Sequence, residues 1–179
     1  MTRTLDPART ALVLVDLMPR IIGLPLAPRS GDEVLRAACE LAKQFGAAGA
    51  AVLAVRVERP GEERQPPGSE LHPDVAGLAD AVVVKRTTGA FQDTALDALL
   101  RERGVTTLVL GGIATNLGVE STARVADDLG YKLVFAEEAM TALTAQEHEA
   151  AVRLNFPRMG TVVAGVDLTV SHQDSRPTA

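Results

Sequence analysis

The sequence offers little sulfur and few aromatic rings from which a site could be built. Its 179 residues include one cysteine, Cys39, and no tryptophan, and aromatic side chains make up only 3% of the chain. A single cysteine excludes an intramolecular disulfide and any zinc site built from several cysteines. Because aromatics are so scarce, the core has to be aliphatic, which suits helices packed on a parallel sheet.

Long apolar runs and an excess of positive charge are also absent. No run approaches the roughly 20 residues that a membrane-spanning helix needs, and residues 1–10 lack the apolar core of a secretory signal. The formal net charge is −5, which leaves no basic surface for nucleic acid. We therefore expect one cytoplasmic domain over residues 1–179, with no membrane or nucleic-acid partner and with a disordered tail at 171–179.

Short apolar segments alternate with amphipathic ones from end to end. Six of them are rich in β-branched residues and too short to be helices, namely 10–16, 50–57, 80–85, 106–111, 132–137 and 161–166. Strands that are apolar on both faces predict an α/β fold in which helices cover both sides of a parallel sheet.

The segments between these strands carry helix signals. Ser30 and Glu33 form a capping box ahead of an amphipathic stretch, and Thr144 and Glu147 repeat that pattern later in the chain. Cys39 falls on the apolar face of the first of these helices, so we expect it to be a core residue. The irregular segment 58–74 is rich in proline, glycine and charge, which predicts an exposed loop.

Two charged residues end apolar strands and are the first candidates for chemistry. Asp16 closes the first strand, and Lys85 closes the third. Ligands of parallel sheets bind beyond the carboxyl ends of the strands, so the two side chains could meet there as an acid–cation pair. The alternative is that each is an ordinary strand-end residue, capping a helix or facing solvent.

The segment 111–118, GGIATNLG, links an apolar strand to a helix. Such a loop can hold an anion or a reacting oxygen on its backbone N–H groups. Its glycines do not have the G-x-G-x-x-G spacing, and no G-K-[ST] follows, so both nucleotide fingerprints are missing. Nucleotide binding stays as a weaker alternative, and glycines that merely allow a tight turn are another.

In order along the chain, the motifs ALVLVD, VVVKRTTGAF, LVLGGIATNLGVESTARVADDLGY and VFAEEAMTA resemble the isochorismatase-like hydrolase superfamily, also called the cysteine hydrolases. The resemblance covers residues 10–163, nearly the whole chain. It implies a Rossmann-like three-layer sandwich with a six-stranded parallel sheet flanked by helices. It also implies a homo-oligomer, a dimer or a tetramer, that acts on a small molecule.

The resemblance also assigns site residues. Asp16 and Lys85 match two members of the family's catalytic triad, while the nucleophilic cysteine falls on Gly118. A non-proline cis peptide is expected at Ile113–Ala114, within an oxyanion-binding loop that comprises Ile113, Ala114, Thr115 and Leu117.

The glycine at the cysteine position decides which family mechanism can apply. No thioester can form at Gly118, whereas true isochorismatases also carry a glycine there and cleave a vinyl ether to release pyruvate. On that model Asp16 is the general acid, Lys85 tunes it and binds substrate, and the space at Gly118 admits substrate.

The resemblance departs from isochorismatases at Arg59, where they have a glutamine, and at Asn116, in a stretch where they tend to have an aromatic residue and a histidine. We expect both residues to bind substrate, and Arg59 with Arg56 suggests that the substrate is anionic. The alternative is that the two arginines belong to a solvated loop. No counterpart of the zinc ligands of nicotinamidase-like members is present, so we expect neither a metal nor a cofactor. A non-catalytic, small-molecule-binding member of the family is the alternative.

Overall fold

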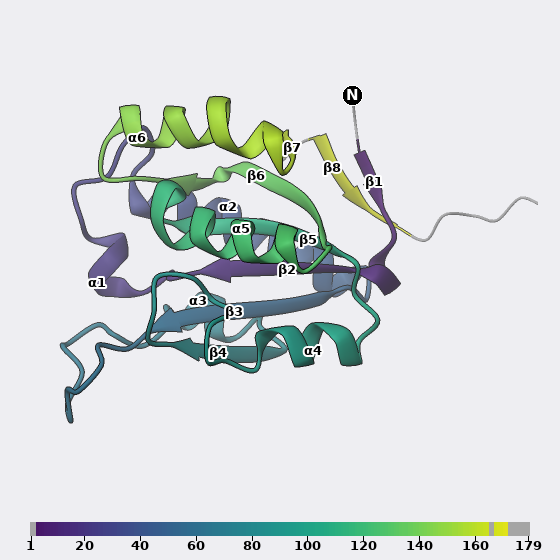
Figure 1. Cartoon of the computed structure of the whole chain (residues 1–179). Helices are drawn as coiled ribbons and strands as arrows, with labels where there is room; N and C mark the ends of the chain where they lie inside the picture. Colours follow the sequence, from purple (N-terminus) through teal and green to yellow (C-terminus); the bar gives the residue numbers. More distant parts are fainter. Residues whose placement is uncertain (1–2, 165–166, 172–179) are drawn as a thin grey trace, which may run out of the picture.

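A computed structural model describes residues 3–164 and 167–171 (Figure 1). Its centre is a parallel sheet of six strands in the order β4-β3-β2-β5-β6-β7, which confirms the predicted α/β sandwich. The six strands match the six apolar segments of the sequence and are β2 (Thr10–Val15), β3 (Ala51–Val57), β4 (Ala81–Lys85), β5 (Thr107–Ile113), β6 (Lys132–Thr141) and β7 (Gly160–Val163).

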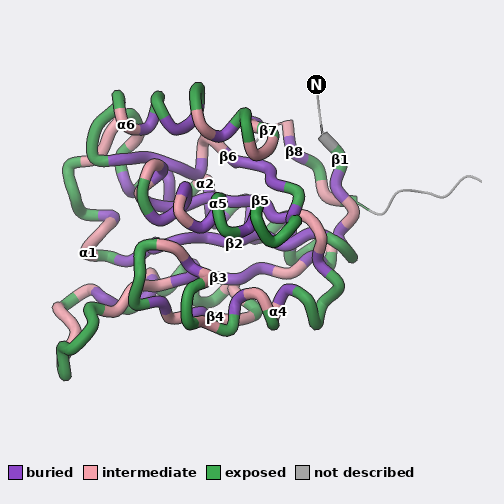
Figure 2. The backbone as a smooth tube through the Cα atoms, in the orientation of Figure 1, coloured by how far each residue is buried: buried purple, intermediate pink, exposed green. Residues whose placement is uncertain are grey.

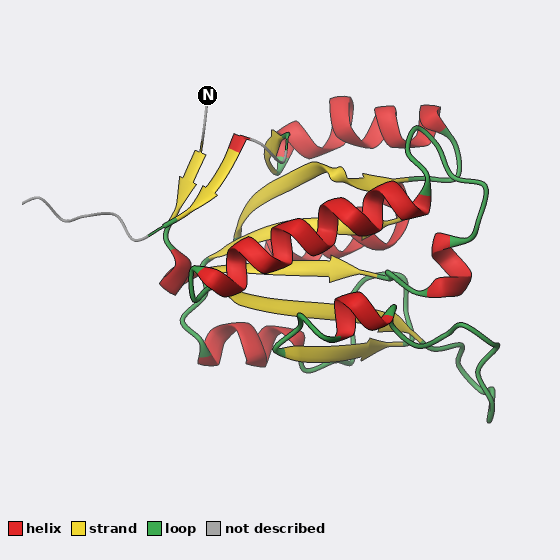
Figure 3. Cartoon of the chain, turned by 180° about the vertical axis from the view of Figure 1, so that it is seen from behind, coloured by secondary structure: helices red, strands yellow, loops and turns green. Residues whose placement is uncertain are grey.

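Helices cover both faces of this sheet. On one face lies α2 (Gly31–Ala47), together with α1 (Pro19–Ile22) and α3 (Pro73–Ala76), as the view from behind shows (Figure 3). The other face carries three further helices and their continuations, namely α4 (Leu96–Glu102), α5 (Glu120–Asp128) and α6 (Ala145–Ala150).

The central strand β2 shows why its sequence is apolar throughout. Leu12 and Leu14 belong to the hydrophobic cluster under α2, whereas Val13 and Val15 belong to the cluster on the opposite face. Successive strand residues point to opposite faces, so a sheet covered on both sides needs apolar residues at every position. The central strands are accordingly buried along their length (Figure 2).

The predicted helix caps are present. The Ser30 hydroxyl accepts from the Glu33 N–H while the Glu33 carboxylate accepts from the Ser30 N–H, which completes a capping box. Thr144 caps α6 through the Glu147 N–H.

Several short helical segments extend the main helices. Thr115–Val119 is a π-helical turn, η2, that runs into α5, and another, η3 (Ala151–Asn155), follows α6. A 3₁₀ turn, η4 (Phe156–Arg158), follows η3, and another, η1 (Pro7–Arg9), lies apart from the helices, between β1 (Arg3–Leu5) and β2.

The sequence did not predict a second, two-stranded parallel sheet near the chain ends. It pairs β1 (Arg3–Leu5) with β8 (Leu168–Val170), and the Ser171 N–H donates to the Leu5 carbonyl at 3.1 Å. Of the tail expected to be disordered, residues 172–179 lie outside the described residues. No helix in the described part of the chain is both long and apolar enough to cross a membrane.

Candidate active site

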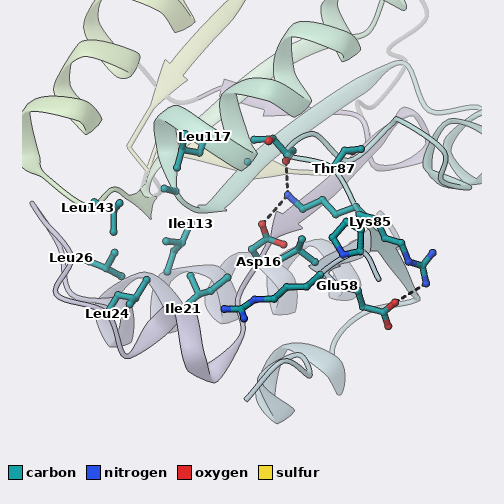
Figure 4. A pocket seen from close by; sticks show the side chains of 17 residues that line it. Asp16, Ile21, Leu24, Leu26, Glu58, Lys85, Thr87, Ile113, Leu117 and Leu143 are labelled. Carbon is teal, nitrogen blue, oxygen red and sulfur yellow. Dashed lines mark hydrogen bonds and ion pairs between the residues drawn. The ribbon is translucent and has the colours of Figure 1, made fainter. Parts of the chain in front are cut away.

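A cavity of about 430 Å³ opens at the carboxyl ends of the strands, where ligands of parallel sheets bind (Figure 4). Residues from the ends of β3, β4 and β5 line it, together with residues that follow β2 and β6. The irregular segment after β3, which projects from the body in Figure 1, contributes its first three residues. The lining residues include Asp16, Val57, Glu58, Arg59, Pro60, Lys85, Ile113, Ala114, Leu117, Gly118 and Leu143.

Asp16 lies where the chain turns away from the end of β2. Its N–H donates to the Val55 carbonyl at 2.8 Å, and its carbonyl accepts from the Met18 N–H at 2.9 Å. Its φ of 56° is in the left-handed region, which aspartate tolerates better than most residues and which is found preferentially at functional sites. The turn leaves Asp16 only 6% exposed.

The structure brings Asp16 and Lys85 together, as the sequence predicts. Lys85 Nζ lies 2.8 Å from Asp16 Oδ2 and also donates to the Thr88 carbonyl at 2.6 Å (Figure 4). Lys85 is 2% exposed, so this is a buried ion pair. Asp16 Oδ1 is buried and has no hydrogen-bond partner among the described residues.

Burial has the largest effect on the pKa of the Asp16 carboxyl group. It raises the pKa of Asp16 above the usual aspartate value, although the charge and hydrogen bond of Lys85 and the charge of Arg20 act in the opposite direction. Because the neutral form is favoured by removal from water, Asp16 is better suited to donate a proton than an exposed aspartate is.

Gly118 lies against this pair at the start of the helix that follows β5. A Cβ atom at position 118 would lie 3.0 Å from Val15 Cγ1 and 3.2 Å from both Asp16 Oδ2 and Lys85 Nζ. Gly118 also lines the cavity. Because position 118 has no side chain, the ion pair can pack directly against the helix there.

The loop between β5 and η2 has the expected backbone but not all of the expected free N–H groups. The Ile113–Ala114 peptide is cis, and both residues line the cavity. The Ala114 carbonyl accepts from the N–H groups of Leu117, at 3.1 Å, and Val119, at 3.2 Å. The Leu117 N–H is thus engaged within the loop. It is not free to bind an oxyanion, which differs from the prediction, although the Leu117 side chain lines the cavity.

Asn116, predicted to bind substrate, is not among the cavity-lining residues, and neither is Thr115, which was predicted as part of the oxyanion-binding loop. Successive side chains of a helix point in different directions, so Leu117 and Gly118 face the cavity while Thr115 turns into the core. Thr115 Oγ1 lies 2.8 Å from Nδ1 of the buried His148, and Asn116 Oδ1 is buried without a partner among the described residues. No sequence pattern pointed to His148 as this partner.

The arginines that suggested an anionic substrate are paired with carboxylates. Arg59 lines the cavity, with a side chain 55% exposed, and its Nη1 lies 3.4 Å from Glu62. Arg56 does not line the cavity; it binds Glu58 at 2.8 Å, and Arg86 binds the other oxygen of Glu58 at 2.7 Å.

Cys39 lies in the core, as expected, and away from this cavity. It packs in the hydrophobic cluster under α2, and burial raises the pKa of its thiol. The separate cavity that it lines shares no residue with the one that holds Asp16. No cluster of three or more His, Cys, Asp or Glu within the described ranges could hold a metal ion.

One wall of the cavity was missed by sequence reasoning altogether. It consists of aliphatic side chains from α1, the segment after α1 and the segment after β6, none of which carries a motif; these are Ile21, Leu24, Leu26 and Leu143. An apolar residue in a connecting segment resembles any other surface apolar residue in the sequence, so only the fold could bring these four together.

Comparison with known proteins supports the resemblance drawn from the motifs. The chain is 39% identical over 175 residues to the isochorismatase family protein YecD of Escherichia coli O157:H7. The aligned region covers 88% of this chain and 93% of YecD. Streptothricin hydrolase of Streptomyces noursei is 35% identical over 133 residues, 72% of this chain and 53% of that enzyme.

Solved structures agree. An isochorismatase family protein from Burkholderia thailandensis superimposes with a TM-score of 0.80 at 35% identity, over 94% of this chain and 97% of that protein. The model of the isochorismatase domain matches residues 10–166, which include both members of the buried ion pair and the glycine beside it. The chain therefore belongs to the isochorismatase family of hydrolases.

Proposed function

We propose that this protein is a hydrolase of a small molecule that works without a cysteine nucleophile, with Asp16 as its general acid. The observation that carries the proposal is the buried Asp16–Lys85 pair, which lines the cavity beside Gly118. The triad position that would hold sulfur holds glycine, and Cys39 lines a different cavity. On this proposal, chemistry at the cavity proceeds by proton transfer and not through a thioester.

Vinyl-ether hydrolysis is the reaction that best suits a buried carboxylic acid with no nucleophile beside it. Asp16 donates its proton to the terminal vinyl carbon, which leaves an oxocarbenium ion on the substrate. Water adds to the cationic carbon and its proton returns to Asp16. The resulting hemiacetal or hemiketal collapses to a carbonyl product and an alcohol, so no bond to the enzyme forms. With an enolpyruvyl ether such as isochorismate, the carbonyl product is pyruvate.

Lys85 supports this acid and does not react itself. Its ammonium is anchored between the Thr88 carbonyl and Asp16 Oδ2, which orients the carboxyl group and stabilises the carboxylate left after proton donation. A positive charge held beside the acid thus limits how far burial can raise its pKa.

The test is product release by wild type and Asp16→Asn, side by side. Isochorismate is the first substrate to try, with pyruvate followed by coupled lactate dehydrogenase. We expect Asp16→Asn to lower turnover at least 100-fold, since an amide cannot supply the proton. Asp127→Asn, on the exposed end of α5, is the matched control and keeps full activity. Turnover that survives in Asp16→Asn, or that a thiol reagent stops, contradicts the proposal.

A non-catalytic binding protein is the second candidate. One observation counts against a hydrolase that passes through an oxyanion, because the Leu117 N–H, which would stabilise the oxyanion, is already bound to the Ala114 carbonyl. A binder predicts ligand-induced thermal stabilisation that is not accompanied by turnover, because a ligand that binds only the native state raises the melting temperature.

A further inference from the structure

We propose that the cavity recognises its substrate mainly by packing an apolar part of the substrate against a wall of leucine and isoleucine side chains (the leucine wall). Ion pairing adds little to the affinity. The inference rests on the proposed function in one respect, namely that the substrate of the reaction binds in the cavity that Asp16 lines. It replaces the anionic substrate suggested by the arginines of the sequence with a substrate class defined by shape and apolar surface.

The leucine wall lies opposite Glu58 and Lys85, and Asp16 lies between them and the wall. In Figure 4 its side chains gather on one side, while Glu58, Lys85 and Thr87 lie on the other. The wall comes from three segments far apart in the sequence, and its members are Ile21, Leu24, Leu26, Ile113, Leu117 and Leu143. A ligand seated beside Asp16 therefore has aliphatic carbon along one flank.

Three leucines of this wall are unusually exposed. Leu24 is 43% exposed, and Leu117 and Leu143 are each 47% exposed. They are three of the seven large hydrophobic side chains that are exposed within the described residues, yet they line one cavity. Single exposed leucines are ordinary, whereas a group around a cavity marks a surface that a ligand can cover. Covering it would remove apolar area from water, which favours binding.

The cations of the cavity are already committed to carboxylates of the protein. Arg86 binds Glu58 at 2.7 Å, and Glu58 is held from its other side by a second arginine. Arg59 pairs with Glu62, and Lys85 is buried against Asp16. A ligand carboxylate would have to compete with these partners and with water, and such exchanges at exposed pairs yield little net free energy.

A matched pair of vinyl ethers tests the inference. Phenyl vinyl ether and 4-(vinyloxy)benzoate share the aromatic body and the scissile bond and differ by one carboxylate. Binding of each to wild-type protein is measured by ligand-observed NMR, independently of turnover. We expect the dissociation constants of the two probes to agree within about threefold, because the aromatic ring carries the affinity in both.

Four variants separate the two kinds of contact. Leu143→Asn and Leu117→Asn should each weaken both probes about tenfold, because each removes part of the wall. Leu154→Asn is the matched control, since Leu154 is 63% exposed but does not line the cavity. Arg59→Gln should change the affinity for the carboxylate probe by less than threefold.

Two results would overturn the inference. One is binding of the carboxylate probe more than tenfold tighter than its neutral partner, with Arg59→Gln abolishing the difference. The other is absence of binding by both probes. Hydrolysis of either probe would release acetaldehyde. If the proposed function failed and the inference held, both probes would still bind and would bind more weakly to Leu143→Asn, but no acetaldehyde would be released.

Discussion

Lys85 Nζ lies 2.8 Å from Asp16 Oδ2, and this contact between two buried side chains organises the candidate site. Lys85 ends β4 and Asp16 follows β2, so the contact spans the carboxyl end of β3, the strand between them. Removing either partner would leave an uncompensated charge in a place with little water, which is why both are kept close and in fixed geometry.

Replacing Lys85 by methionine should raise the pKa of Asp16 further. Burial already raises this pKa, and Lys85 is the first of the groups that lower it, so its removal leaves only the charge of Arg20 to oppose burial. The neutral form of the carboxyl then persists to higher pH. The measurement is a carboxyl ¹³C NMR titration, with the Asp16 resonance assigned by its loss in Asp16→Asn.

Lys43→Met, on the exposed face of α2, is the control for Lys85→Met and should leave the titration unchanged. Lys85→Met should also cost about 3–5 kcal/mol of stability at neutral pH, because it breaks a buried pair, and less at acid pH, where Asp16 is neutral. An Asp16 pKa that falls or stays the same in Lys85→Met would refute the assignment of Lys85 as the opposing charge.

Adding one methyl group at Gly118 should disturb the site. Gly118→Ala places a Cβ 3.2 Å from both atoms of the ion pair, so the pair or the helix has to move by a few tenths of an ångström. We expect a loss of about 1–3 kcal/mol in unfolding free energy, as for other overpacked sites, and a clear loss of turnover. Urea denaturation and the product assay measure the two effects.

Gly46→Ala is the matched control for Gly118→Ala. A Cβ built at Gly46, an exposed position in α2, meets no atom within 4 Å beyond the neighbouring residues and backbone of its own helix among the described residues, so alanine should stabilise the helix by roughly 0.5–1 kcal/mol. If Gly118→Ala proved as harmless as Gly46→Ala, the close packing of the ion pair against the helix would not describe the protein in solution.

The sequence predicted those parts of the site that follow from strand ends. Asp16 and Lys85 close apolar strands, and parallel strands bring their carboxyl ends to one edge, so the pair could be expected before the structure was known. The six strands and the capping box of α2 could also be predicted from the sequence, since each depends on a local pattern of apolar or capping residues.

Side-chain directions after β5 and the apolar wall could not be predicted in the same way. The π-helical turn at 115–119 turns Thr115 toward His148 and leaves Leu117 facing the cavity, and no one-dimensional pattern specifies that rotation. Leu24 and Leu143 come from connecting segments without periodicity, so their meeting depends on the whole fold. The pairing of Arg59 with Glu62 likewise depends on how one loop folds back on itself.

Cys39→Ser should leave activity unchanged and reduce stability. Cys39 packs in the cluster under α2, so a hydroxyl in its place has to be buried without an assured partner, at a cost of about 1–3 kcal/mol. Chemical denaturation measures the loss of stability. The product assay, with and without a thiol-alkylating reagent, measures the activity. Loss of turnover in a Cys39→Ser protein that is still folded would show that the thiol contributes to the reaction, contrary to its place in a separate cavity.

His148 should make stability fall as the solution becomes acidic. Burial is the main cause that lowers its pKa below the usual 6.5, and Arg29 and Arg153 add to the effect while Glu137 and Glu149 oppose it. The unfolded chain therefore takes up the proton first, so stability declines as pH falls from about 6.5 toward the folded-state pKa.

His148→Gln tests this prediction. The variant should be less stable than wild type at pH 7.5, because the buried contact with Thr115 is altered, yet its stability should decline less between pH 7 and pH 5. Urea midpoints across that range give both quantities. If the stability of His148→Gln fell with pH as steeply as that of wild type, His148 would not be the cause of the acid sensitivity. Other titrating groups would then be responsible.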